Sequence, residues 1–190
     1  FKMTKLLSTE QMAEFANSGC LFFEGLIDED INKEFLNDIG HTDIDDVDNI
    51  QHYFQNIKSS SSIPRIPAGT ALKDAYPLNS PLEKIFKNEI VSGAINSLVG
   101  SKTVVDHQFL HLTFPSKYYA KANQRQMSQV NHQDSTIDPR TTFDIQLFYF
   151  PTAVTKEMGG TRYIPGTHLR IVNEMGIAKY QNIKGQKNII

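Results

Sequence analysis

The stretch HQDSTIDPRTTFDIQLFYF, residues 132–150, decides which fold this chain can adopt. Side chains alternate between the two faces of a β-strand, so His132 and Asp134 share one face and Gln133 points to the other. An imidazole and a carboxylate on one face are two of the three protein ligands of a 2-His-1-carboxylate iron site. This stretch therefore predicts a non-haem Fe(II) centre carried by a β-sheet.

A second His-x-Asp sequence, His41-Thr42-Asp43, shows that the tripeptide alone is not specific. It follows Gly40 at an expected helix end and opens an acidic stretch without strand periodicity. We interpret this copy as a solvated loop. The metal is assigned to His132 and Asp134, because an apolar run with strand character follows only that copy.

Further motifs follow this apolar run at residues 143–150. Met158-Gly159-Gly160 predicts a turn, and residues 161–164 predict a short strand that Pro165-Gly166-Thr167-His168 closes. This order of His-x-Asp, apolar strand, Gly-Gly turn and Pro-Gly-Thr-His resembles the phytanoyl-CoA dioxygenase family of Fe(II)- and 2-oxoglutarate-dependent oxygenases. The coupled motifs are more specific than any one of them alone.

The resemblance implies an α+β fold, a double-stranded β-helix (jelly roll) with N-terminal helices packed outside it. It implies Fe(II) bound by His132 and Asp134, with 2-oxoglutarate as cosubstrate. The expected reaction is hydroxylation, or another oxidation by dioxygen, of a small-molecule substrate. Related halogenases lack this carboxylate, so Asp134 favours oxygenation.

The segment in which this resemblance would place the third iron ligand contains no histidine. In the family, a second histidine and an arginine that binds 2-oxoglutarate lie well beyond the Pro-Gly-Thr-His turn, but residues 177–190 contain neither. Either the C-terminal strands and the third ligand lie beyond Ile190, or His168 takes that role. We favour the first, because fewer strands can be counted than the about eight of a jelly roll. His168 is then a turn histidine that hydrogen-bonds to the backbone.

Residues 103–114 predict a strand on which Gln108 shares a face with Leu110 and Leu112. By resemblance, Gln108 orients substrate or cosubstrate; the alternative is an edge glutamine that faces water. His107 and His111 lie on the opposite face, where packing or solvent contact is the favoured interpretation.

Other residues have weaker functional assignments. Phe148 matches a family position that lies against 2-oxoglutarate, and its alternative is a plain core aromatic. Arg162 and Arg170 are interpreted as surface residues, although a guanidinium could bind a carboxylate. The polar stretch of residues 116–129 predicts a loop over the site, where substrate specificity would lie.

The chain before residue 100 predicts mainly helices. Ser8 and Gln11 form a capping box for a helix that ends at Gly19, and residues 21–23 read as a short strand. A second helix is expected from Asp28 to Gly40. After a loop-rich region, a third is expected from Ser80 through Leu98. We expect one domain, residues 1–190, with a helical flank at 1–100 and a partial jelly-roll core at 101–190.

The amino-acid composition favours a soluble globular protein that acts on small molecules. The 190 residues are 39% hydrophobic and 21% charged, with a net charge of -2 and a pI near 6.3. These values argue against nucleic-acid or polybasic membrane partners. The lone Cys20 suits a reducing compartment and a buried structural thiol, and no signal peptide or membrane span is recognised, so we expect a cytoplasmic protein.

A second function class stays open from the sequence. A jelly-roll protein that has lost its iron site would bind a ligand without catalysis, and His132 and Asp134 would then only form hydrogen bonds. A histidine downstream of Ile190, followed by an arginine, would favour the enzyme.

Overall fold

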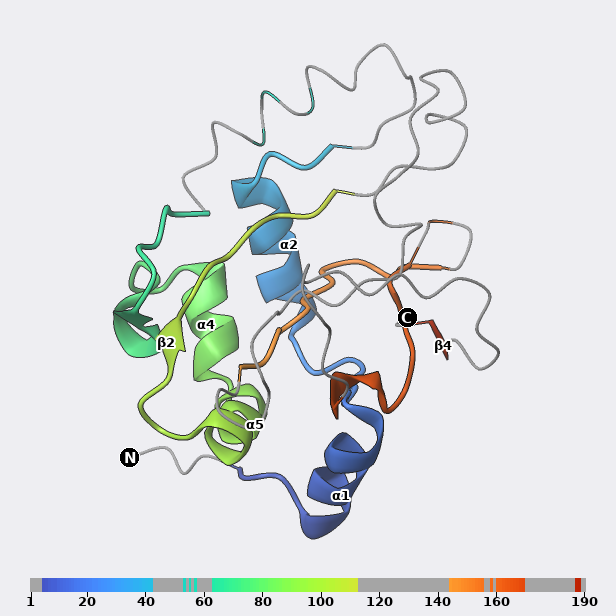
Figure 1. Ribbon diagram of the computed structural model, residues 1–190. Coiled ribbons are helices and arrows are strands. Elements are labelled where there is room, and N and C mark those ends of the chain that lie inside the picture. The colour runs from blue at the N-terminus through green and yellow to red at the C-terminus, as the bar shows by residue number, and fades with distance from the viewer. Residues whose placement is uncertain are drawn as a thin grey trace, which may run out of the picture. The chain divides into compact units, whose positions relative to one another are not determined.

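The computed structural model describes residues 5–42, 53, 55, 57, 63–112, 144–155, 158, 160–169 and 187–188 (Figure 1). These residues divide between two compact units. The first unit contains residues 1–7, 24–111 and 148–152, and the second contains residues 8–23, 112–147 and 153–190. The predicted iron ligands His132 and Asp134, Arg170 and the loop of residues 116–129 lie outside the described residues.

Three helices form the centre of the first unit: α2 (Glu29–Asp38), α4 (Pro81–Lys87) and α5 (Glu89–Val99). Helix α2 packs beside α4, and α4 contacts α5 (Figure 1). The predicted start of α2 is correct, although the Asp28 side chain makes no capping hydrogen bond. Its end is also as predicted, because Gly40 adopts a left-handed φ of 70° beyond the last turn.

The helix expected from Ser80 through Leu98 is wrong in one respect, because it is broken at Asn88. Ser80 accepts a hydrogen bond from the Glu83 backbone N–H, and Pro81 occupies the first helical position, as predicted. Asn88 then leaves the helical conformation, with a ψ of 132°. Its side-chain oxygen accepts from the N–H groups of Ile90 and Val91, so one asparagine ends α4 and caps α5.

The core of this unit lies where the helices meet. Its buried apolar residues are Phe35, Ile39, Tyr53, Ile57, Ala75, Ile85, Val91, Ala94 and Ile95. Ile85 is only 2% exposed, and the neighbouring Pro81 is fully buried as well. The Tyr149 ring packs edge-on against Phe35, with centroids 5.2 Å apart, which brings residues 148–152 to this core.

Residues 5–7 attach to the flank of α5. The Lys5 backbone N–H donates to the Glu89 carbonyl oxygen at 3.1 Å, and the Leu7 N–H donates to Ser97 Oγ at 3.0 Å. Gly93 makes this approach possible, because a Cβ there would lie 1.9 Å from the Lys5 carbonyl oxygen. Backbone thus packs directly on a helix at this point.

The first unit also contains a two-stranded antiparallel sheet. Strand β1 (Thr70–Ala71) pairs with β2 (Val104–Val105), and the 3-10 helix η2 (Leu72–Asp74) follows β1 directly. The strand predicted over residues 103–114 is therefore shorter than expected, since residues 106–112 form no ladder. The region before Ser80, expected to be loops, contains β1 and η2.

The second unit contains helix α1, a short sheet and a 3-10 helix. Helix α1 (Thr9–Ser18) has both hydrogen bonds of the predicted capping box, and Gly19 ends it with a φ of 79°. Strand β3 (Arg162–Tyr163), within the predicted strand of residues 161–164, pairs antiparallel with β4 (Lys187–Asn188). The 3-10 helix η5 (Thr167–Leu169) follows β3.

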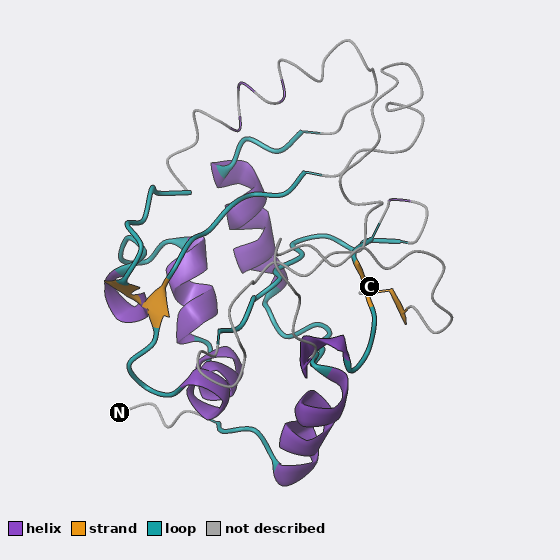
Figure 2. Cartoon of the chain, viewed as in Figure 1, coloured by secondary structure: helices purple, strands orange, loops and turns teal. Residues whose placement is uncertain are grey.

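Two predicted strands are wrong among the described residues. Residues 21–23 and 144–150 run as irregular segments (Figure 2). Apolar and aromatic content favours a strand, but a strand forms only where a neighbouring chain completes the hydrogen-bond ladder. The described residues contain two short antiparallel pairs, so the jelly roll stays a prediction. No helix in the described ranges is long and apolar enough to cross a membrane.

Because of Tyr149, the free energy of unfolding should fall as the pH rises through the alkaline range. Its hydroxyl donates to Asn32 Oδ1 at 2.6 Å, and burial raises the pKa of Tyr149 from 10.0 to about 12. The unfolded chain loses this proton first as pH rises, so stability present below pH 10.0 is lost up to about pH 12. We expect Tyr149→Phe to reduce this alkaline loss. At neutral pH the variant should lose about 1 kcal/mol through the missing hydrogen bond.

Urea unfolding at neutral pH and across the alkaline range would measure both effects. An alkaline loss of stability as steep in Tyr149→Phe as in the native protein would show that this phenol does not contribute to it.

Candidate functional site

The two residues predicted to hold the metal, His132 and Asp134, are not among the described residues, so their geometry stays a prediction. In the described part of the chain, no group of three or more His, Cys, Asp or Glu side chains could hold a metal ion. The alternative copy, His41-Thr42-Asp43, is described only up to Thr42. His41 is exposed, as expected for a solvated loop, and its Nδ1 lies 2.8 Å from the Tyr53 hydroxyl.

Gln108 is engaged with the backbone of its own unit. Its Nε2 donates to the Pro64 carbonyl oxygen at 2.5 Å, and the residue is half-buried. Neither alternative from the sequence included this bond, because the acceptor lies 44 residues earlier. The alternation itself was correct, since Gln108, Leu110 and Leu112 are all less exposed than their neighbours. The amide N–H of Gln108 bonds to Pro64, while its side-chain oxygen makes no hydrogen bond to any other residue that the structure describes.

On the opposite face of residues 107–111, three exposed rings lie one after another. The His107 ring is parallel to Phe109, with centroids 5.9 Å apart, and His111 follows at 6.2 Å from Phe109. Phe109 is 65% exposed, and His107 Nδ1 lies 2.7 Å from Asp106 Oδ2. The interpretation of these histidines as packing and solvent-contact residues is confirmed.

Phe148 lies at the surface and not in the core. It is 51% exposed, and its ring is parallel to Phe150 at a centroid distance of 6.4 Å. The core alternative is therefore wrong, because Tyr149 is the residue of this segment that packs on Phe35. Its role beside 2-oxoglutarate stays a prediction.

The ring of His168 lies against the end of α1. Nε2 lies 3.2 Å from the Ala16 carbonyl oxygen, which confirms the predicted hydrogen bond to the backbone. Nδ1 is buried with no hydrogen-bond partner among the described residues, and a Cβ on Gly19 would lie only 2.4 Å from it. The Gly166 N–H also donates to the Ser18 carbonyl oxygen at 2.9 Å. The Pro-Gly-Thr-His turn thus docks on the end of α1, and neither nitrogen of His168 is open to a metal.

Burial raises the pKa of two groups in this unit. Burial, and then the Glu14 carboxylate, raise the pKa of the Cys20 thiol. Burial also raises the pKa of Tyr163, with smaller effects from Cys20 and Glu14. A raised pKa favours the neutral thiol form of Cys20, in agreement with its structural interpretation, although Cys20 is half-buried and not fully buried. Arg162, on β3, is exposed as interpreted.

Comparison with known proteins gives one family. A family model described as phytanoyl-CoA dioxygenase (PhyH) matches residues 15–188. The match includes His132, Asp134 and the turn at residues 165–168. No curated protein and no solved structure matches the chain.

Proposed function

This chain belongs to the phytanoyl-CoA dioxygenase family, and on that premise we propose that it is a dioxygenase dependent on Fe(II) and 2-oxoglutarate. The family match over residues 15–188 is the observation that carries the proposal. The substrate proposed is a small molecule, oxidised by dioxygen, and hydroxylation is the favoured outcome.

The donor set fits the metal. An imidazole nitrogen and a carboxylate oxygen are the ligand types of open Fe(II) sites, and His132 and Asp134 supply one of each. His132 would bind through a neutral ring nitrogen, while the Asp134 carboxylate would offset part of the metal charge. When bound, iron and 2-oxoglutarate supply the oxidation of a C–H bond, and the cosubstrate becomes succinate and carbon dioxide.

The remaining tasks belong to the chain's own side chains. The rigid anchor of Gln108 on Pro64 suits a residue that presents its amide oxygen in one orientation. Phe148 offers an exposed ring that can cover a bound organic acid and exclude water. His168 is given no role at the metal, because its ring joins the turn at residues 165–168 to α1.

Succinate formation tests the proposal without knowledge of the substrate. Oxygenases of this kind consume some 2-oxoglutarate even when no substrate is bound. We expect the full-length protein with Fe(II), 2-oxoglutarate and air to form succinate slowly, as measured by mass spectrometry with labelled 2-oxoglutarate.

Omission of Fe(II), or exclusion of air, serves as the control and should stop succinate formation. Succinate at the same rate without iron would point to a contaminant. No succinate and no binding of 2-oxoglutarate would favour the alternative of a non-catalytic binding protein.

A further inference from the structure

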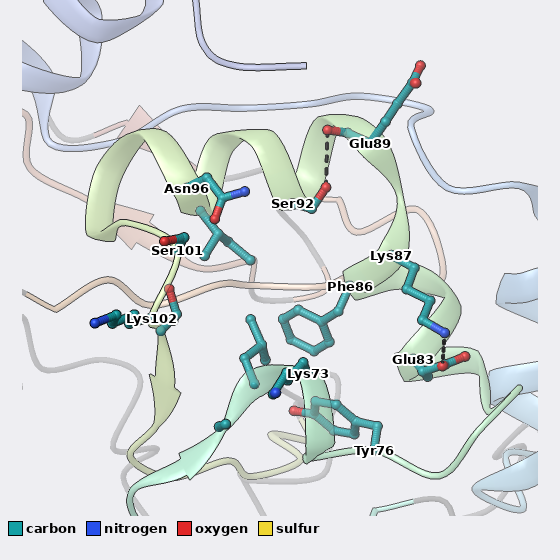
Figure 3. A pocket seen from close by; sticks show the side chains of 14 residues that line it. Lys73, Tyr76, Glu83, Phe86, Lys87, Glu89, Ser92, Asn96, Ser101 and Lys102 are labelled. Atoms are coloured by element: carbon teal, nitrogen blue, oxygen red, sulfur yellow. Dashed lines mark hydrogen bonds and ion pairs between the residues drawn. The ribbon is translucent and has the colours of Figure 1, made fainter. Parts of the chain in front are cut away.

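A cavity of about 570 Å³ lies within the first unit, among residues that the proposed oxygenase chemistry does not use (Figure 3). Its walls come from α4 and α5, from the segment β1–η2, and from the turn that leads into β2. The volume lies within the range of about 300–1,000 Å³ that is usual for small-molecule sites. Gln108 and Phe148, the described residues to which the oxygenase chemistry assigns a role, do not line it.

One wall of the cavity is flat and aromatic. The rings of Tyr76 and Phe86 are stacked, with centroids 4.9 Å apart and an interplanar angle of 14°. The Phe86 ring points into the cavity (Figure 3), and the buried side chain of Ile95 adds apolar surface from α5. Such a wall favours a planar apolar body, because aromatic rings prefer offset stacking or edge contacts with other rings.

Three lysines from different elements are among the residues that line the cavity. Lys87 is neutralised by its ion pair with Glu83, but Lys73 and Lys102 form no ion pair with any residue that the structure describes. They come from η2 and from the turn before β2. The carboxylate of Glu89 points away from the cavity (Figure 3), so it does not offset these two charges. An unpaired pair of ammonium groups attracts an anion and can donate hydrogen bonds to it.

Neutral donors complete the polar side. The side chains of Asn96 and Ser101 line the cavity and make no hydrogen bond to another described residue. By contrast, the Ser92 hydroxyl is already used, since it donates to the Glu89 carbonyl oxygen at 3.3 Å. Two lysines and two polar side chains without a bond to another described residue therefore share one cavity with a stacked aromatic wall.

We propose that this cavity binds a small organic anion, a carboxylate or a phosphate carried on a flat aromatic body. Lys73 and Lys102 bind the anionic group, and the ring of the ligand lies on Phe86. This site belongs to the first unit, and binding there needs neither iron nor 2-oxoglutarate.

Binding of four compounds, measured by calorimetry and by amide chemical shifts, tests the roles of the anionic group and of the aromatic ring. The compounds are 2-naphthoate, 2-naphthyl phosphate, the neutral 2-naphthamide and inorganic phosphate. We expect at least one of the two aromatic anions to bind and to shift the amide signals of residues 72–76 and 101–103. The double variant Lys73→Gln with Lys102→Gln should weaken its binding about tenfold, and Phe86→Ala should also weaken it. Binding of one anion only would identify the carboxylate or the phosphate as the recognised group.

Lys33→Gln is the matched control, because this exposed lysine is paired with Glu29 on α2 and does not line the cavity. It should leave binding unchanged. Equal affinity for 2-naphthamide, equal affinity in the double variant, or binding of inorganic phosphate alone would overturn the proposal. So would the failure of both aromatic anions to bind.

Discussion

Replacement of His132 or Asp134 by alanine will abolish the visible absorption band that Fe(II) and 2-oxoglutarate give together on this protein without air. The band arises only when the keto acid chelates a metal that the protein holds. Each substitution removes a direct bond to the metal. Even the loss of a group that only orients a ligand lowers metal affinity or activity by about 10–100-fold, so the loss of the ligand itself should have a larger effect. Anaerobic titration of the full-length protein, read by absorption, measures the result, and succinate formation should fall to background in both variants.

Matched substitutions test whether the effect is specific. Asp43→Ala and His107→Ala change the same residue types at positions interpreted as solvated or shown to be exposed, and both should retain the band. His168→Ala should also retain it, since Nε2 contacts the Ala16 carbonyl oxygen and Nδ1 is buried. An unchanged band in His132→Ala and Asp134→Ala would disprove their assignment. Loss in His168→Ala alone would transfer the role of ligand to that residue.

Among single substitutions in the first unit, Ile85→Ala is expected to cause the largest loss of folding stability. The side chain is 2% exposed at the centre of α4, which packs between α2 and α5. Its truncation removes buried methyl groups and leaves a cavity that rigid helices cannot fill, at a cost of about 2–5 kcal/mol. Chemical denaturation followed by circular dichroism would give the free energy of unfolding.

Leu78→Ala provides the comparison for the same unit. Leu78 is 75% exposed in the loop before α4, so its truncation should change stability by no more than about 0.5 kcal/mol. Similar losses in the two variants would mean that α4 is not packed as described.

Local signals in the sequence predicted the ends of helices well. The capping box at Ser8, the serine and proline that begin α4, and the glycine that ends α1 all act through residues within one helical turn. The break at Asn88 had a local signal too, an asparagine followed by Glu89, but the apolar periodicity that runs across it concealed the break.

Contacts between distant residues could not be predicted in this way. Which segment pairs with β2, and which carbonyl accepts from Gln108, depends on partners more than 30 residues away in the sequence. Residues 144–150 have strand composition, yet Tyr149 inserts into a helical core instead. For the candidate site, the coupled motifs identified the family, while the geometry of His132 and Asp134 stays a prediction.

The attachment of residues 5–7 to α5 affects the order in which this protein can fold during synthesis. Leu7 and Ser97 are separated by 90 positions, so residues 5–7 have no docking surface until α5 has also left the ribosome. Closure of so long a loop is slow relative to the formation of single helices. Residues 5–7 therefore reach their native place only after α5 has been synthesised.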